Sequence, residues 1–133
     1  MTPARGDFDL DAFDSNEYDD VDGTKLAQVR ITKTFRGDLE ARGTVTMLSA
    51  RAPIETSAVY VALERVDGRL NGKQGSFVLR HDGLTEGGAS TLTVTVVPDT
   101  ATAELTGLRG DFHIEIDTDG AHHYRFEYTL PAS

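Results

Sequence analysis

Short runs of alternating Thr, Val and aromatic residues, separated by Gly, Asp and Asn, recur along nearly the whole chain. Alternation with a period of two places successive side chains on opposite faces of a β-strand. In the run AQVRITKTF, Val29, Ile31 and Phe35 share one face, and Lys33 is the one charged residue on that face. No window keeps a helical apolar stripe for three turns. The pattern therefore favours an all-β barrel or sandwich.

Turn signals divide these runs into seven or eight strands. Asp67-Gly68, Asn71-Gly72 and Asp119-Gly120 are strong turn dipeptides. Pro98 should end the strand before it, because proline cannot donate a hydrogen bond to a neighbouring strand. The acidic segment 15–25 is predicted to be a loop. This number of strands is enough to close a small barrel that holds side chains or one small ligand.

A length of 133 residues is the usual size of one domain, so we expect a single domain over 1–133. Residues 1–6 and 131–133 are expected to be loose ends. The N-terminal sequence lacks the basic and apolar regions of a signal peptide, and no apolar stretch is long enough to cross a bilayer. We therefore expect a cytoplasmic protein.

The net charge of -9 argues against nucleic-acid binding, because only 13 Lys and Arg are present and they are scattered. Binding to an acidic membrane surface is disfavoured for the same reason. The chain has no cysteine, which excludes disulfides, thiolate metal sites and cysteine nucleophiles. Solubility is the simplest explanation of the acidity.

Unusual polar residues occur in the run SAVYVALER. Val59, Val61 and Leu63 lie on one face of this run. Tyr60 and Glu64 lie on the other face, together with small alanines. Small residues beside one Tyr and one Glu suit a pocket wall. The alternative is that the three aliphatic residues fill the core while the Tyr and Glu meet solvent. On this stretch alone the alternative is slightly favoured.

Two further runs put polar groups on apolar faces. In GSFVLRHDG, His81 follows Phe77 and Leu79 on one face, where partial burial could suit it to proton transfer near neutral pH. A hydrogen bond to a turn is the commoner role of such a histidine. In HHYRFEYTL, Tyr124 and Tyr128 lie on a face whose other members are His122, Phe126 and Leu130. Buried tyrosine hydroxyls need hydrogen-bond partners.

Several familiar sites are disfavoured. His122 and His123 are adjacent, so on a strand they point to opposite faces and make a poor metal pair. Neither HxH nor HExxH spacing occurs, and there is no GxSxG elbow. No glycine-rich segment follows the strand-to-helix pattern of a phosphate loop. We expect no metal and no cofactor.

The order of motifs resembles a known family. The runs KTFRGDLEARG, YVALERVDGRLNGKQGSFVLRHDG, TVTVVPD, ELTGLRGDFHIEI and GAHHYRFEYTL are similar to the bacterial domain of unknown function 3224, from about Phe8 to Leu130. The usual glycine-rich SGTGEL segment is replaced by DTATAEL at 99–105, which alters that edge of the fold.

The resemblance implies a closed antiparallel eight-stranded β-barrel of the allene oxide cyclase-like (calycin-like) type with a central cavity. Barrels of that type include allene oxide cyclase, dirigent proteins and bacterial spirotetronate cyclases of natural product biosynthesis. Such enzymes hold one conformer in an apolar cavity with one or two polar groups. Fold alone does not identify a substrate.

Three hypotheses follow. The first is a cofactor-independent isomerase or cyclase acting on a small apolar metabolite, with Glu64 and His81 as acid/base groups. The second is a carrier that binds a ligand in the same cavity without chemistry. The third is a homodimer or higher homo-oligomer that acts as a scaffold, with a filled core. The residues predicted to bind the substrate are Tyr60, Phe77, Leu79, Tyr124, Phe126, Tyr128 and Met47.

Overall fold

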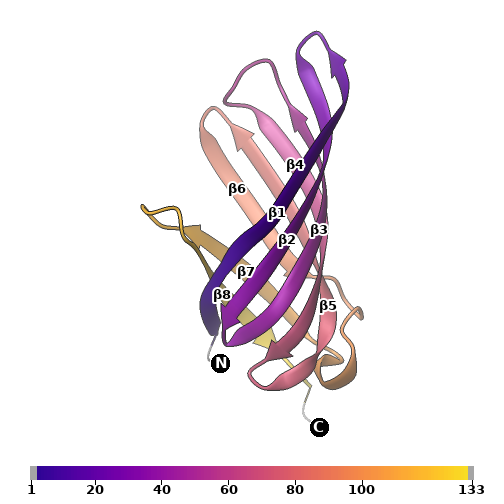
Figure 1. Ribbon diagram of the computed structural model, residues 1–133, viewed down its shortest axis with the longest axis vertical. Coiled ribbons are helices and arrows are strands. Elements are labelled where there is room, and N and C mark those ends of the chain that lie inside the picture. Colours follow the sequence, from indigo (N-terminus) through magenta and orange to yellow (C-terminus); the bar gives the residue numbers. More distant parts are fainter. Residues whose placement is uncertain (1–2, 132–133) are drawn as a thin grey trace.

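The computed structural model describes residues 3–131 and shows a closed barrel of eight antiparallel strands in chain order (Figure 1). The predicted all-β class is confirmed. The one helical element in the described part of the chain is the short 3-10 turn Ala103–Leu105. The strands are β1 (Ala4–Val21), β2 (Thr24–Gly37), β3 (Leu39–Arg51), β4 (Ala58–Leu70), β5 (Lys73–Glu86), β6 (Ala89–Val96), β7 (Arg109–Ile116) and β8 (His122–Thr129).

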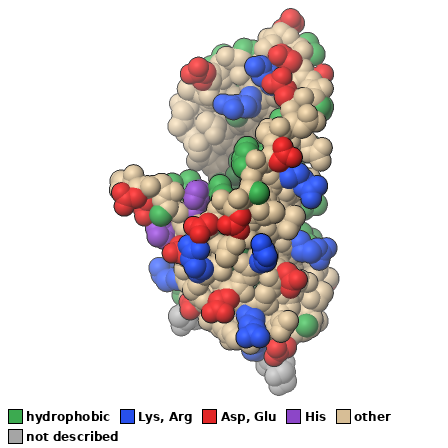
Figure 2. Space-filling model, in the orientation of Figure 1, with side chains coloured by type: hydrophobic (Ala, Val, Ile, Leu, Met, Phe, Trp, Pro, Cys, Tyr) green, Lys and Arg blue, Asp and Glu red, His purple; other side chains and the backbone are tan. Residues whose placement is uncertain are grey.

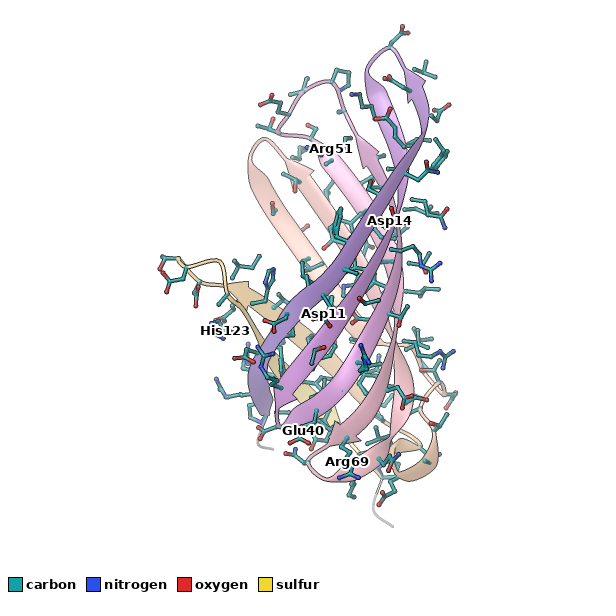
Figure 3. The ribbon with its side chains drawn as sticks, viewed as in Figure 1. Asp11, Asp14, Glu40, Arg51, Arg69 and His123 are labelled. Atoms are coloured by element: carbon teal, nitrogen blue, oxygen red, sulfur yellow. The ribbon has the colours of Figure 1, made fainter. Side chains whose placement is uncertain are left out.

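The barrel has two different ends. The start of β1 and the end of β8 lie at one end, which we call the closed end (Figure 1). The turns that join β1 to β2, β3 to β4 and β5 to β6 lie at the other, which we call the open end. Arg51 at the upper end of β3 and Arg69 near the lower end of β4 mark these two ends in Figure 3.

The barrel wall is complete only toward the closed end. β1 pairs with β8 over residues 4–8 alone, although β1 continues to Val21. β6 and β7 are joined at the single pair Thr95 and Asp111. Toward the open end, β1 to β6 therefore form a curved sheet whose concave side is not covered by β7 and β8. We call this concave side the trough.

The closed half of the barrel is filled by aromatic and aliphatic side chains. Phe126 is fully buried, and its ring centroid lies 5.3 Å from Phe112 and 5.9 Å from Phe77. Phe35 packs edge-on against Phe112 at 5.8 Å. Aromatic pairs at these separations add to the stabilisation from burial. The filled-core interpretation thus describes one half of the barrel.

Three expectations about local structure are wrong. Residues 15–21 continue β1, and the loop is a tight turn at Asp22 and Gly23, both with positive φ. Asp67 and Gly68 lie inside β4 and do not form a turn. Gly68 packs against β3, where any side chain would overlap the backbone of residues 40–41. Residues 4–6 belong to β1, while 1–2 and 132–133 of the expected loose ends lie outside the described residues.

Other expectations are confirmed. β6 ends at Val96, just before Pro98. Asn71-Gly72 and Asp119-Gly120 form the turns after β4 and β7, and both glycines have positive φ. Among residues 3–131, no helix is long and apolar enough to cross a membrane.

Candidate functional site

Glu64 points into the barrel. Alternation along β4 turns Tyr60, Ala62 and Glu64 inward, and turns Val61 and Leu63 outward, where they are about half exposed. The interpretation that the aliphatic face of this strand fills the core is therefore wrong. Glu64 is fully buried, and Leu63 is 57% exposed.

One oxygen of Glu64 accepts hydrogen bonds from two cationic or potentially cationic groups. His81 Nε2 lies 2.7 Å from Glu64 Oε1, and Lys33 Nζ lies 3.2 Å from the same oxygen. Lys33 comes from β2 and His81 from β5, so the cluster ties three strands across the interior. All three side chains are buried. A buried carboxylate needs such partners to remain charged.

The environment keeps Glu64 ionised. Burial by itself would raise the pKa of this carboxyl, but the hydrogen bond from His81 and the charge of Lys33 outweigh it and hold the pKa below its ordinary value. Because an ionised carboxylate only accepts, His81 Nε2 must carry the proton that it shares with Glu64. A neutral His81 is then left with an unprotonated Nδ1, which can accept a proton.

Lys33 is also held by aromatic rings. Its Nζ lies 4.9 Å from the centroid of Phe8 and 5.9 Å from that of Phe35. Such rings attract a cation through the negative potential of their faces. The cation is therefore fixed at the boundary between the aromatic core and the trough, with Glu64 as its one salt-bridge partner among residues 3–131.

The trough lies directly beyond this cluster. Its floor is a second group of buried aliphatic residues, Val29, Ile31, Val45 and Ala62, with Met47 packed against them. His81 pairs with Ala62 and with Val94, so it belongs to the same layer. Figure 2 shows the surface hollowed on this side of the molecule.

Apolar side chains at the rim of the trough remain exposed. Leu92 pairs with Gly83 on the concave face and is 43% exposed. Phe13 pairs with the inward residue Ile31 and is 64% exposed. Exposed apolar groups around a concave floor with a few polar groups are typical of a site for a small ligand.

Residues 4–128 match the model of a family described as a protein of unknown function, DUF3224. The chain belongs to the DUF3224 family. A crystal structure of a DUF3224 protein with unknown function, from Shewanella oneidensis MR-1, is 40% identical in sequence with a TM-score of 0.88. The alignment covers 100% of this chain and 99% of that one. No curated protein matches significantly.

The predicted site residues of this DUF3224 protein fall into two groups. Glu64 and His81 meet in one hydrogen bond, and Tyr60 and Met47 face the trough beside them. Glu64 is fully buried beneath His81 and Lys33, so it has no surface of its own toward the trough.

The remaining predicted substrate-binding residues lie elsewhere. Phe77, Leu79 and Phe126 are at most 1% exposed and fill the closed half, so they have no surface toward the trough. Tyr128 lies near the closed end, where its hydroxyl accepts a hydrogen bond from Asn71 Nδ2 at 2.6 Å. Alternation alone could not show where along each strand the barrel is filled.

Tyr124 has a structural role in the closed half. The backbone N–H of Leu39 donates to its hydroxyl at 2.8 Å, and the hydroxyl donates to the carbonyl of Arg36 at 2.8 Å. Burial raises the pKa of Tyr124 to about 12. Both hydrogen bonds of the Tyr124 hydroxyl therefore go to the backbone, where they stabilise the turn between β2 and β3.

Sequence reasoning assigned no role to Lys33. Its position as the one charge on the apolar face of 27–35 was the available signal. A buried lysine on such a face requires a buried acceptor. The acceptor is two strands away, and only the register of β2, β3 and β4 shows that it is Glu64.

Among residues 3–131, no three His, Cys, Asp or Glu side chains are grouped so that they could hold a metal ion. His123 lies on the outside of β8, and its Nε2 is 2.8 Å from Asp117 Oδ2 (Figure 3). This exposed pair is separate from the trough and fixes the turn between β7 and β8.

Proposed function

We propose that this protein binds a small, mostly apolar molecule in the trough and exchanges a proton with it through His81. The observation that carries the proposal is the position of the Lys33–Glu64–His81 cluster at the floor of an open apolar concavity. A buried ionic cluster costs free energy to desolvate, and a core made only of aliphatic residues avoids that cost. Groups of this kind gather at sites of chemistry more often than elsewhere.

The arrangement gives each residue a distinct role. Lys33 keeps Glu64 ionised, Glu64 fixes the orientation and tautomer of the His81 ring, and His81 Nδ1 is the free acceptor. A carboxylate behind a histidine is a recurrent way of orienting an acid/base group. The resemblance to allene oxide cyclase-like barrels also supports a cofactor-independent isomerase or cyclase. A carrier without chemistry needs the trough but not the ionic cluster.

The chain contains a convenient reporter for binding. Only two methionines are present, Met1 and Met47, and Met47 lies against the floor of the trough. In protein labelled with carbon-13 at the methionine methyl groups, we expect 1-naphthol to shift the Met47 signal and to leave Met1 unchanged. 1-Naphthol combines an apolar bicyclic ring with one hydroxyl group, as the trough requires.

A matched pair of variants locates the bound probe. Leu92→Asp changes the concave rim, whereas Leu84→Asp changes a leucine of similar exposure (49%) on the outer face of the neighbouring strand. We expect Leu92→Asp to weaken 1-naphthol binding by about tenfold or more, since a charge replaces apolar contact area. Leu84→Asp should bind as the unaltered protein does. Equal binding by both variants, or an unperturbed Met47 methyl, would contradict the proposal.

A further inference from the structure

Tyr60 faces the trough from the strand next to His81. Tyr60 on β4 pairs with Gly83 on β5, and a side chain on Gly83 would overlap the Tyr60 ring. The glycine thus lets the phenol lie across β5. No hydrogen bond joins the Tyr60 hydroxyl to any of residues 3–131, and the side chain is half-buried. A half-buried phenol without a protein partner is available to a ligand.

Register places this phenol one diagonal step from the imidazole. His81 is two residues before Gly83 on the same inward face, and it pairs with Ala62. The residue positions of diagonal neighbours on one face of a sheet are about 7–8 Å apart, which is within reach of long side chains. The Tyr60 and His81 side chains can therefore contact one small molecule. The other two residues of this block, Ala62 and Gly83, are small.

The two groups have complementary chemistry. Burial raises the pKa of Tyr60, so its hydroxyl stays protonated at neutral pH and can donate to an oxygen. His81 Nε2 is occupied by Glu64, which leaves Nδ1 as an acceptor. A hydrogen-bond donor for an oxygen and a base for a proton thus come from neighbouring strands on the inward face of the barrel.

We infer that the substrate is an apolar ketone with a hydrogen on the carbon next to the carbonyl, and that Tyr60 and His81 act on it together. This inference rests on the proposed function and names its substrate class. The Tyr60 hydroxyl donates to the carbonyl oxygen, and His81 Nδ1 removes the adjacent proton. A donor aimed at the oxygen stabilises the enolate that forms.

The step balances without an added reactant. The C–H bond breaks, its electron pair forms the carbon–carbon double bond of the enolate, and the negative charge moves to the oxygen held by Tyr60. The proton on Nδ1 makes His81 an imidazolium ion, whose charge lies beside ionised Glu64. The proton then returns to the same carbon or to a conjugated one. The net result is proton exchange or migration of a double bond.

The experiment follows 2-tetralone in D2O with the intact protein. Its C1 protons lie next to the carbonyl, and their replacement by deuterium is read by proton NMR. We expect the protein to accelerate this exchange, Tyr60→Phe to slow the protein-dependent rate on the order of 100-fold, and His81→Gln to reduce it to the buffer rate. Tyr18→Phe, which changes an exposed tyrosine on β1, should leave the rate unchanged.

The Met47 methyl signal distinguishes a failure of the ketone inference from a failure of the proposed binding in the trough. If 2-tetralone shifts Met47 but exchanges at the buffer rate, the ketone inference is overturned and binding in the trough stands. If exchange is accelerated equally by Tyr60→Phe, the role of Tyr60 is overturned. If neither 1-naphthol nor 2-tetralone shifts Met47, the proposed function fails and the inference fails with it.

Discussion

Gly43 and Glu64 lie so close on neighbouring strands that no side chain fits between them. A Cβ built on Gly43 would overlap Glu64 Oε2 and would lie 3.0 Å from Phe35 Cε2. Glu64 Oε2 is buried without a hydrogen bond from residues 3–131, while Oε1 accepts both bonds of the cluster. The glycine therefore provides the space in which the carboxylate sits.

Gly43→Ala should destabilise the protein by about 2 kcal/mol, because overpacking a tight interior forces side chains or backbone to move. The neighbouring change Thr44→Ala affects an exposed side chain and should alter the free energy of unfolding by less than about 0.5 kcal/mol. Urea unfolding of both variants measures the difference. Equal stability of the two variants would contradict the claim that the space at Gly43 is too small for a methyl group.

Lys33→Met removes one partner of a buried carboxylate. We expect a loss of about 3 kcal/mol in the free energy of unfolding at pH 7, because Glu64 then keeps its charge with His81 alone. Arg30→Met changes an exposed cation on the same strand and serves as the control. The double change Lys33→Met with Glu64→Gln should recover part of the loss. An additive loss in the double variant would contradict the coupling between the two residues.

The depressed pKa of Glu64 gives stability a defined dependence on pH. A carboxyl whose pKa is lower in the folded than in the unfolded protein stabilises the fold above the unfolded value, and loses this contribution as pH falls through the folded value. The difference in unfolding free energy between the unaltered protein and Glu64→Gln should thus be full above about pH 5 and shrink toward lower pH. Chemical unfolding from pH 3 to 7 tests this. A difference independent of pH would mean that Glu64 is not ionised in the fold.

Tyr124 should matter for stability and not for the trough. Tyr124→Phe leaves the buried N–H of Leu39 and the carbonyl of Arg36 without this partner, which should cost about 2 kcal/mol. Tyr128→Phe removes a bond to an exposed asparagine and should cost less than about 1 kcal/mol. Thermal unfolding ranks the two variants. Loss of 1-naphthol binding by a folded Tyr124→Phe protein would contradict the division of the barrel into a filled half and a trough.

Some features of the site could be predicted from sequence because they depend on alternation within one strand. The spacing of Phe77, Leu79 and His81 predicted that they share one face, and the structure turns that face inward. Which face of β4 points inward could not be predicted from its spacing, because both faces carry apolar residues and the buried face includes Glu64. Aliphatic residues on the outer face are exposed because β4 is covered only on its inner side.

Other features depend on relationships between strands. Lys33 reaches Glu64 past Gly43 on the strand between them, and no local pattern contains that register. The acidic residues of 15–21 resemble a loop because this part of β1 is exposed on both faces at the edge of the trough. In Figure 3, Asp11 and Asp14 lie along this strand. The open half of the barrel could therefore not be predicted from composition.

The tautomer of His81 tests the central claim most directly. Long-range nitrogen-15 NMR of protein labelled at its four histidines distinguishes a ring protonated at Nε2 from one that averages between tautomers. With Glu64 in place, we expect the His81 signals to show a fixed Nε2–H tautomer, and Glu64→Gln to release it. His113, whose side chain is exposed and whose Nε2 is no closer than 4.0 Å to Glu127, should average between tautomers in both proteins. A His81 ring that averages like His113 in the unaltered protein would contradict the claim that buried Glu64 prepares His81 for proton transfer.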